Sequence, residues 1–244
     1  MQIGIDVGGT KIKLGSFTSL EKPQISNSIT ISTSNNCEED IKEVTKAIFT
    51  LSKGIIEGIG IGLPGVLNKE KSKILIANNL KSWENKEIKH EFEKRFNCKV
   101  VIENDATAAA LGEALYGNGI NKDFLFITWG TGIGGTFVKK LNGRIYTFSS
   151  ELGHQIIKED GVIDSCGQKG CLEAYCGGKG IENLYEKSPA KLLDKEWREV
   201  EESFAKGLLN IVAIHPVELI IFSGGIALNQ EIRISHIQKY SLII

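Results

Sequence analysis

The chain has 244 residues, of which 41% are hydrophobic, and this is enough to bury the core of one large domain or two small ones. Charged residues make up 24% and the formal net charge is −1, so no global positive field favours nucleic acid or an anionic membrane. The longest apolar stretches, such as Phe124–Trp129, are much shorter than the roughly 20 residues of a membrane-spanning helix. The first residues lack the pattern of a signal peptide, and we therefore expect a cytoplasmic protein without a membrane partner.

The first half of the chain alternates strand and helix patterns. Short β-branched stretches bounded by glycine turns predict strands at Ile3–Val7, Ile12–Phe17, Ile25–Ile31, Gly58–Leu63 and Lys99–Glu103. Helical spacing of apolar residues predicts helices over Glu38–Ser52, Ile88–Phe96 and Thr107–Tyr116.

The second half repeats this beginning. It predicts strands at Phe124–Trp129, near Thr136–Lys140 and at Glu218–Phe222, a loop-rich segment from about Ser149 to Gly180, and a helix at about Trp197–His215. Each half starts with a strand, a Gly/Thr-rich turn and a second strand. We therefore predict two similar α/β domains, residues 1–116 and 117–244, with a working hinge between them because no low-complexity linker separates them.

The first turn of interest is Asp6–Lys11. Its glycines, Gly8 and Gly9, allow backbone N–H groups to approach phosphate oxygens closely. Thr10 adds a hydroxyl and Lys11 a positive charge, while Asp6 can hold Mg²⁺ through water. The alternative is a hairpin turn whose glycines only supply positive φ.

A second turn of the same kind follows the strand at Phe124–Trp129. It contains Gly130, Thr131, Gly132, Gly134 and Gly135. Two such turns at equivalent places in two half-chains can hold the phosphates of one nucleotide from both sides. A strand rather than a helix is expected after each turn, and no Gly-Lys-Ser/Thr ending is present, so neither is a Rossmann or Walker motif.

Two further segments carry reactive side chains. In Glu103–Thr107, Asp105 is either part of a helix N-cap or a carboxylate that accepts the proton of an attacking hydroxyl, and these readings are compatible. Farther on, His154 precedes Cys166 and Cys171, a set that can enclose tetrahedral Zn²⁺ on glycine-rich turns. An odd count of five cysteines, without a signal peptide, argues against a disulfide framework.

In this order, the motifs Asp6–Lys11, Glu103–Asp105, Gly130–Gly135 and Glu151–His154 with Cys166–Glu173 resemble the ROK family of bacterial sugar kinases, in the actin/hexokinase fold superfamily. The resemblance extends from Met1 to about Ala227. It implies an α/β protein of two ribonuclease H-like domains around a central cleft. It also implies that phosphoryl transfer from Mg·ATP to a hexose, most directly O6 of glucose, is the activity, with N-acetylmannosamine or N-acetylglucosamine as alternative substrates.

The resemblance assigns roles to individual residues. It implies Asp105 as the catalytic base and sugar contacts from Gly65, Asn79, Asn104, Asp105, Glu151, His154 and Glu173. It implies ATP contacts from Asp6, Gly8, Gly9, Thr10, Lys11, Gly130, Thr131, Gly132, Gly134, Gly135, Gly224 and Gly225. His154 would place one nitrogen on a structural zinc and turn the other toward the sugar.

The sequence departs from the family pattern in two places. The family's first zinc-loop cysteine is Asp164 here, so the expected ligands are His154, Asp164, Cys166 and Cys171; a set that uses Cys176, or no metal, are the alternatives. The chain also stops about twenty residues after the Ser223–Gly225 turn, where family members continue. We therefore expect a second domain that is shortened at its C-terminus, either by truncation or frameshift or as a naturally reduced member.

Two other functions compete with the kinase. A sugar-responsive regulator would carry a DNA-binding segment ahead of the first turn, and only five residues precede Asp6, so no nucleic-acid partner is expected. A sugar-binding protein without catalysis is favoured by the short C-terminus and disfavoured by Asp105 and the two glycine turns. The oligomeric state is open, with a homodimer as the assembly considered.

Overall fold

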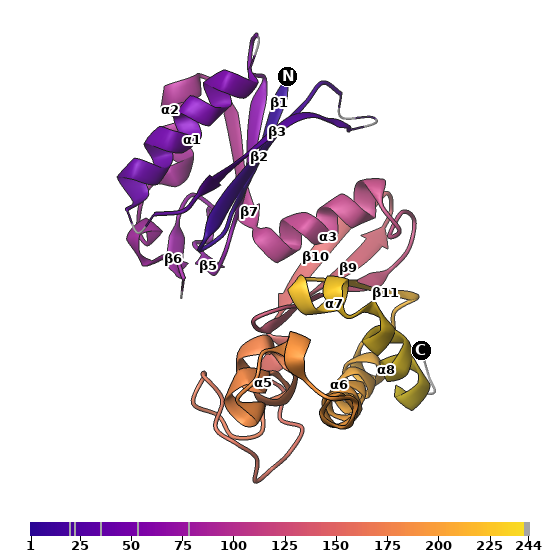
Figure 1. Cartoon of the computed structure of the whole chain (residues 1–244). Helices are drawn as coiled ribbons and strands as arrows, with labels where there is room; N and C mark the ends of the chain where they lie inside the picture. The colour runs from indigo at the N-terminus through magenta and orange to yellow at the C-terminus, as the bar shows by residue number, and fades with distance from the viewer. Residues whose placement is uncertain (20, 22, 35, 53, 78, 242–244) are drawn as a thin grey trace. The chain divides into compact units, whose positions relative to one another are not determined.

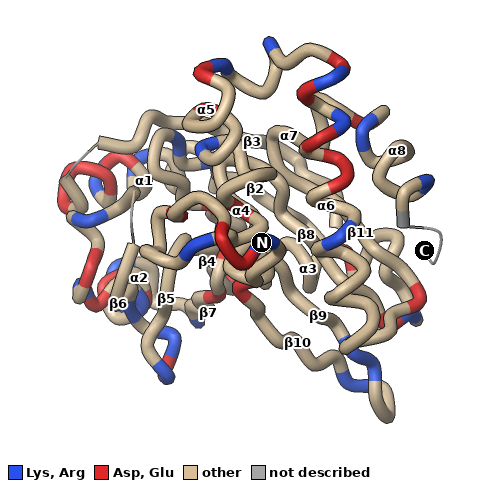
Figure 2. The backbone as a smooth tube through the Cα atoms, turned by 90° about the horizontal axis from the view of Figure 1, so that it is seen from below, with Lys and Arg blue, Asp and Glu red and all other residues tan. Residues whose placement is uncertain are grey.

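The computed structural model describes residues 1–241 except 20, 22, 35, 53 and 78. The chain forms two compact units, Met1–Ala109 and Ala110–Ile244. Each contains a mixed β-sheet with helices packed on it (Figure 1). Basic and acidic residues are interspersed within each unit (Figure 2). None of the described helices combines the length and the apolar character that crossing a bilayer demands. The domain limits 1–116 and 117–244 remain a prediction.

The first unit is built on a five-stranded sheet. Its strand order is β3 (Ile25–Ser32), β2 (Lys11–Phe17), β1 (Gln2–Val7), β4 (Gly58–Leu63) and β7 (Lys99–Asn104). The first three strands are antiparallel, and β4 and β7 run parallel to β1. Ile3, Ile5 and Val7 alternate into the core, as expected of a strand with one face on a helical layer.

Helices α1 (Cys37–Leu51) and α2 (Ile88–Phe96) lie side by side against this sheet (Figure 1). The rings of Phe49 on α1 and Phe96 on α2 are 5.6 Å apart. Val44 and Ile48 of α1 are fully buried, as the apolar spacing of the helix requires. Between β4 and α2 the chain forms the short strands β5 (Val66–Leu67) and β6 (Ile74–Ile76) and the 3₁₀ turn η1 (Lys81–Trp83).

The second unit repeats this strand order. Its sheet runs β10 (Arg144–Ser150), β9 (Ile133–Leu141), β8 (Phe124–Trp129) and β11 (Leu219–Ser223), with three antiparallel strands and a parallel fourth. In the first unit a fifth strand, β7, pairs with the outer edge of the fourth strand, β4. Among the described residues of the second unit, no strand pairs with the outer edge of β11.

Helices cover both faces of the second sheet. Helix α3 (Asp105–Tyr116) packs Ala110 and Ala114 against Phe124 and Phe126. On the other face α6 (Asp194–Ile214) places Phe204 4.6 Å from Trp129, ring centre to ring centre. The remaining elements are η2 (Leu152–His154), α4 (Leu172–Cys176), α5 (Gly178–Tyr185), η3 (Pro189–Lys191), α7 (Gly225–Asn229) and α8 (Glu231–Ser241).

The predicted strands and helices of the first half are all present, with ends that move by one or two residues. In the second half, the segment expected to be loop-rich contains η2 and α4, and it also includes the end of β10 and the start of α5. Strand β10 and helices α7 and α8 were not expected. Strand β10 is an edge strand whose side chains alternate between exposed and half-buried, and such a pattern gives little hydrophobic signal.

Candidate active site

The turn between β1 and β2 is braced by the residue that follows β3. Gly8 N–H donates to the Lys11 carbonyl at 2.9 Å. Thr33 holds the turn from the side, because its hydroxyl donates to the Gly8 carbonyl at 2.6 Å and its N–H to the Thr10 carbonyl at 3.0 Å. The side chains of Asp6, Thr10 and Lys11 remain exposed. The turn is therefore fixed by its backbone and leaves its polar side chains free for a ligand.

Gly9 is needed for a close approach and not for its φ angle. A Cβ at Gly9 would lie 2.7 Å from Asn79 Cβ and 2.8 Å from the Asn79 carbonyl oxygen. The turn does join two antiparallel strands as a hairpin, but neither Gly8 nor Gly9 has a positive φ, so supplying that angle is not their role. The contact brings Asn79, an expected sugar ligand, against the expected phosphate turn within one unit.

Asp105 begins α3 directly after β7. The preceding Asn104 is the helix cap, since its Oδ1 accepts from Thr107 N–H at 3.1 Å. Asp105 Oδ1 accepts from Ala106 N–H at 2.8 Å. Burial raises the pKa of Asp105 above its ordinary value, and the charge of Asp6 raises it further. A partly buried carboxylate with a raised pKa, close to a second acid, is suited to accept a proton.

Gly65 joins the same region. Its φ is +85°, and a Cβ there would overlap the Ile76 carbonyl, so only glycine fits without strain. The Gly65 carbonyl accepts from Asn104 Nδ2 at 3.3 Å. Of the sugar-contact residues expected in the first unit, the structure brings Gly65, Asn104 and Asp105 together, and Asn79 lies against the turn at Gly9.

The second glycine turn lies between β8 and β9 and rests on the α4–α5 junction. Gly178 N–H donates to the Gly130 carbonyl at 2.8 Å, and Lys179 N–H to the Thr131 carbonyl at 2.9 Å. Gly132 leaves room for a carboxylate, because a Cβ there would overlap the Glu173 side chain. Gly134 and Gly135 similarly admit Thr128 and Leu152.

The turn at Gly224–Gly225 meets this second turn. Gly224 has φ +96°, and a Cβ there would lie 2.5 Å from the Trp129 carbonyl oxygen. A Cβ at Gly130 would lie 3.6 Å from Gly225 N. The structure thus gathers two of the three expected ATP-binding segments at the ends of neighbouring strands β8 and β11.

Glu173, in the first turn of α4, is bound to the second glycine turn. Its Oε2 accepts from Ile133 N–H at 2.6 Å. Burial raises the pKa of Glu173, and the nearby acids Asp164 and Glu151 add to this effect. The bond from Ile133 N–H and the charge of His154 oppose it. Glu151 is exposed, and its carbonyl accepts from His154 N–H at 3.0 Å. These three expected sugar ligands therefore belong to one electrostatic cluster.

The four expected metal ligands converge. One ligand atom from each of His154, Asp164, Cys166 and Cys171 lies within 4.8 Å of all the others. His154 Nδ1 is 3.0 Å from Asp164 Oδ2, and the two sulfurs are 3.6 Å apart. Tetrahedral zinc with Zn–S bonds of about 2.3 Å separates two sulfurs by about 3.8 Å, so the donor set fits zinc.

Two groups of this cluster have shifted pKa values. Burial raises the pKa of the Cys171 thiol to about 12, so a cation is needed to hold it as a thiolate. The Asp164 side chain is 6% exposed; burial acts to raise its pKa, but bonds to Cys166, the Ser165 backbone and His154 outweigh burial and lower it. The alternative ligand Cys176 lies apart, with its Sγ 3.4 Å from the Val200 carbonyl.

The repeated sheet order, with one glycine turn after the first strand of each sheet, defines a protein of the actin/hexokinase fold. A sequence profile of the ROK family matches residues 2–241, and the chain belongs to the ROK family.

The solved structure of a ROK family glucokinase from Streptomyces griseus, in complex with glucose and AMPPNP, superposes with a TM-score of 0.76 at 27% identity, covering 100% of this chain and 90% of that chain. A glucokinase of Thermotoga maritima is 30% identical over 268 residues, covering 94% of this chain and 83% of the relative. A glucokinase of Streptomyces coelicolor is 34% identical over 185 residues, 74% of this chain.

The chain spans 57% of the length of the Streptomyces coelicolor glucokinase. Some repressors are also similar to this chain in sequence. A xylose repressor of Caldicellulosiruptor bescii is 33% identical over 215 residues, covering 75% of this chain and 53% of the repressor. Family membership therefore includes both relatives named as kinases and relatives named as repressors.

Proposed function

We propose that the protein is an ATP-dependent hexose kinase that transfers a phosphoryl group from Mg·ATP to a sugar hydroxyl, with O6 of glucose as the first acceptor to test. The observation that carries the proposal is Asp105: a half-buried carboxylate with a raised pKa, adjoining Gly62 and influenced by Asp6 at the first glycine turn. The similarity to glucokinases supports the same activity.

In the proposed reaction, Asp105 accepts the proton of the attacking sugar hydroxyl as the bond to phosphorus forms. The backbone amides of the two glycine turns stabilise the charge on the transferred group. Asp6 offers an exposed carboxylate, which suits Mg²⁺ held through water, and the metal would offset the charge of the phosphates. The mechanism requires ATP as the phosphoryl donor. We propose a cytoplasmic location, where ATP is available.

Glu151, His154 and Glu173 are proposed to hydrogen-bond the sugar hydroxyls. Glu173 is preorganised for this by its bond from Ile133 N–H. The cluster of His154, Asp164, Cys166 and Cys171 is proposed to hold a structural Zn²⁺. Because His154 presents Nδ1 to Asp164, its Nε2 is the nitrogen left for a sugar hydroxyl.

A second candidate is a sugar-binding protein that does not transfer phosphate. The similarity to xylose repressors favours it. N-acetylmannosamine and N-acetylglucosamine are kept as alternative substrates for the kinase. A homodimer is kept as an assembly to be measured.

The test is ADP release across a panel of glucose, N-acetylglucosamine, N-acetylmannosamine and xylose, for the wild type, for Asp105→Ala and for Asp160→Ala, which removes an exposed acid. We expect release with at least one hexose, lost in the first variant and kept in the second. Calorimetry with sugar and with a non-hydrolysable ATP analogue completes the test. Sugar binding without nucleotide binding would replace the kinase by the second candidate.

A further inference from the structure

Asp40 carries a buried carboxylate that joins two separate segments of the first unit. It lies in the first turn of α1 and is 2% exposed. Its Oδ1 accepts from Ser34 N–H at 2.7 Å, and its Oδ2 accepts from Trp83 Nε1–H at 3.1 Å. Both partners are donors, so both oxygens must act as acceptors. An ionised carboxylate meets this requirement and an amide does not.

One of these bonds leads to the first glycine turn. Ser34 directly follows Thr33, whose hydroxyl and N–H hold the carbonyls of Gly8 and Thr10. Asp40 therefore fixes the segment that braces the turn. A shift of Ser34 would move Thr33 and release both carbonyls.

The other bond leads to Asn79. Trp83 N–H donates to the Leu80 carbonyl at 3.0 Å, and Leu80 directly follows Asn79. Asn79 in turn lies so close to Gly9 that a Cβ at Gly9 would come within 2.7 Å of Asn79 Cβ. Both bonds of Asp40 thus end at the same contact, where the turn meets Asn79.

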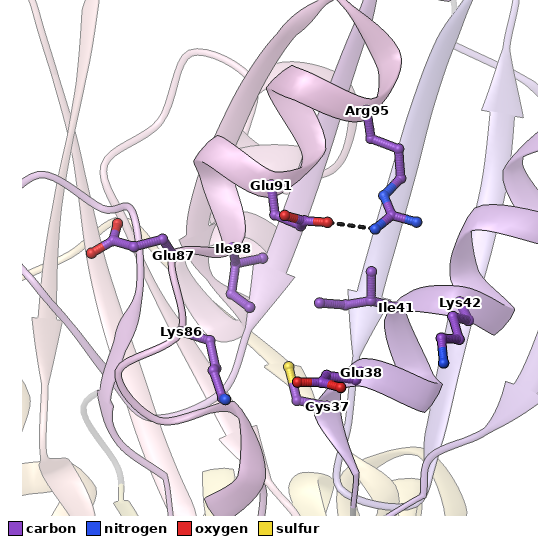
Figure 3. A pocket seen from close by; sticks show the side chains of 9 residues that line it. All are labelled: Cys37, Glu38, Ile41, Lys42, Lys86, Glu87, Ile88, Glu91 and Arg95. Carbon is purple, nitrogen blue, oxygen red and sulfur yellow. Dashed lines mark hydrogen bonds and ion pairs between the residues drawn. The ribbon is translucent and has the colours of Figure 1, made fainter.

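A surface pocket opens beside the start of α1. A cavity of about 400 Å³ separates the start of α1 from the segment that runs from Lys86 into α2 (Figure 3). Cys37 and Ile41 line it from α1, and Lys86, Ile88 and Glu91 line it from the other side. The pocket lies beside the bond between Asp40 and Trp83 and not at it, because neither residue lines it and Trp83 is buried in the core with Ile88.

We propose that Asp40 is a positioning residue of the candidate site. It sets the Gly8–Thr10 turn and Asn79 in register with each other, so that the expected phosphate and sugar contacts of this unit are preorganised together. The kinetic part of this inference rests on the proposed kinase function. The structural part, that Asp40 limits the motion of both segments, does not.

The experiment compares Asp40→Asn with Glu39→Gln. Both remove one negative charge from the same helical turn, but Glu39 is exposed. Asparagine keeps the size of Asp40 and places an NH₂ group against one of its two donors. Amide hydrogen exchange is followed by mass spectrometry in peptides covering 7–11 and 77–83. We expect exchange about tenfold faster in both peptides of Asp40→Asn, in line with the loss of a bond to a charged group, and no change for Glu39→Gln.

Trp83→Phe separates the two bonds. It removes the donor to Asp40 Oδ2 and leaves the bond from Ser34. We expect faster exchange in the 77–83 peptide with a much smaller change in the 7–11 peptide. This variant also keeps the test open should Asp40→Asn fold poorly.

Kinetics supply the second readout. With an active hexose, Asp40→Asn is expected to raise the KM values for ATP and sugar together by about tenfold, with a smaller loss in kcat. A purely structural role would lower the amount of folded enzyme, and hence the apparent kcat, and leave KM unchanged. Exchange rates unchanged in both peptides, or changed equally by Glu39→Gln, would overturn the inference. An inactive wild type would remove the kinase proposal and leave the exchange test standing.

Discussion

Glu173 and Ile133 tie the second glycine turn to helix α4: the backbone N–H of Ile133 donates to Glu173 Oε2 at 2.6 Å. One carboxylate therefore both braces an expected phosphate turn and offers its remaining lone pairs to a ligand. The arrangement depends on Gly132, where any side chain would occupy the space of that carboxylate.

Gly132→Ala is expected to displace Glu173 and to slow phosphoryl transfer about a hundredfold while the protein remains folded. The added Cβ would overlap the Glu173 carboxylate, and a misplacement of about 1 Å in a positioned group costs about a hundredfold in rate. ADP release measures the effect. Gly112→Ala is the matched control, because a Cβ there meets nothing within 4 Å. Full activity of Gly132→Ala would contradict the role given to Glu173.

Asp105→Asn is expected to inactivate the enzyme and to raise its stability at pH 7. Because burial and Asp6 raise the folded-state pKa of Asp105, the ionised carboxylate opposes folding above that pKa. The wild type therefore recovers stability as pH falls through the raised pKa toward the unfolded value, about 3.9. Thermal unfolding of the two proteins should differ most at neutral pH and converge below that value. Asp160→Asn, at an exposed site, is the control.

The same raised pKa predicts the acid limb of the pH–rate profile. A base works only when deprotonated, so kcat/KM should fall as pH drops through the pKa of Asp105 in the free enzyme. The midpoint of this fall should lie above the ordinary aspartate value, in the direction that burial imposes. Initial rates of ADP release between pH 4 and pH 8, under conditions where folding is verified by circular dichroism, give the profile. A midpoint at or below the ordinary value would remove Asp105 as the titrating base.

Protein purified without added zinc is expected to contain about one zinc per chain. Asp164→Ala should lose the metal, Asp164→Cys should retain it, and Cys176→Ala should retain it because Cys176 lies apart from the cluster. Metal analysis by mass spectrometry provides the measurement. Asp160→Ala removes a nearby exposed acid and serves as control. A wild type with a stoichiometry near zero would end the zinc proposal.

Asn104→Ala is expected to lower the free energy of unfolding by about 1 kcal/mol, because the helix cap on Thr107 N–H is lost. Asn104→Ser should keep most of the cap and lose only the donation from Nδ2 to the Gly65 carbonyl. Denaturant unfolding separates these variants from the wild type. Equal stability of all three proteins would show that Asn104 does not cap α3.

Arg233→Met is expected to destabilise the second unit by about 2 kcal/mol, since the buried carboxylate of Glu201 loses its charged hydrogen-bond donor and keeps only His236 Nδ1, 3.0 Å from its Oε1. Glu201 is 1% exposed in its side chain, and Arg233 also lies 5.0 Å from the centre of the Trp197 ring. The double variant Glu201→Gln with Arg233→Met should recover part of the loss in denaturant unfolding. Arg198→Met, an exposed arginine of α6, should have little effect.

Local patterns located much of the fold. The predicted limits of β4, α2 and β8 match the structure residue for residue, because each is a continuous or periodic apolar segment between clear breaks. Helix α8 was not predicted, because its sequence lacks a clear apolar pattern. Its sequence has little amphipathic pattern, and its place depends on Arg233 reaching Glu201 on α6, a contact between residues 32 positions apart.

The site shows the same division. The types of the residues in the glycine turns, at Asp105 and in the His/Cys loop were enough to predict which segments carry chemistry. Thr33 and Asp40 were missed. Thr33 is an ordinary residue after a strand, and Asp40 follows Glu38 and Glu39 in what looks like a solvated acidic first turn. No periodicity distinguishes the buried Asp40 from its two exposed acidic neighbours.

The sequence alone therefore determined the family, the strand–turn–strand start of each half and the chemical types present in the candidate site, because these depend on residue identity and short spacing. Only the tertiary structure decided that Gly9 and Gly132 are required by close approach and that Asp40 joins two distant segments. It also decided that the ligand atoms of the predicted set around Asp164 converge. These features depend on which backbone and side-chain atoms meet across the fold. That information lies in long-range contacts and not in any local pattern.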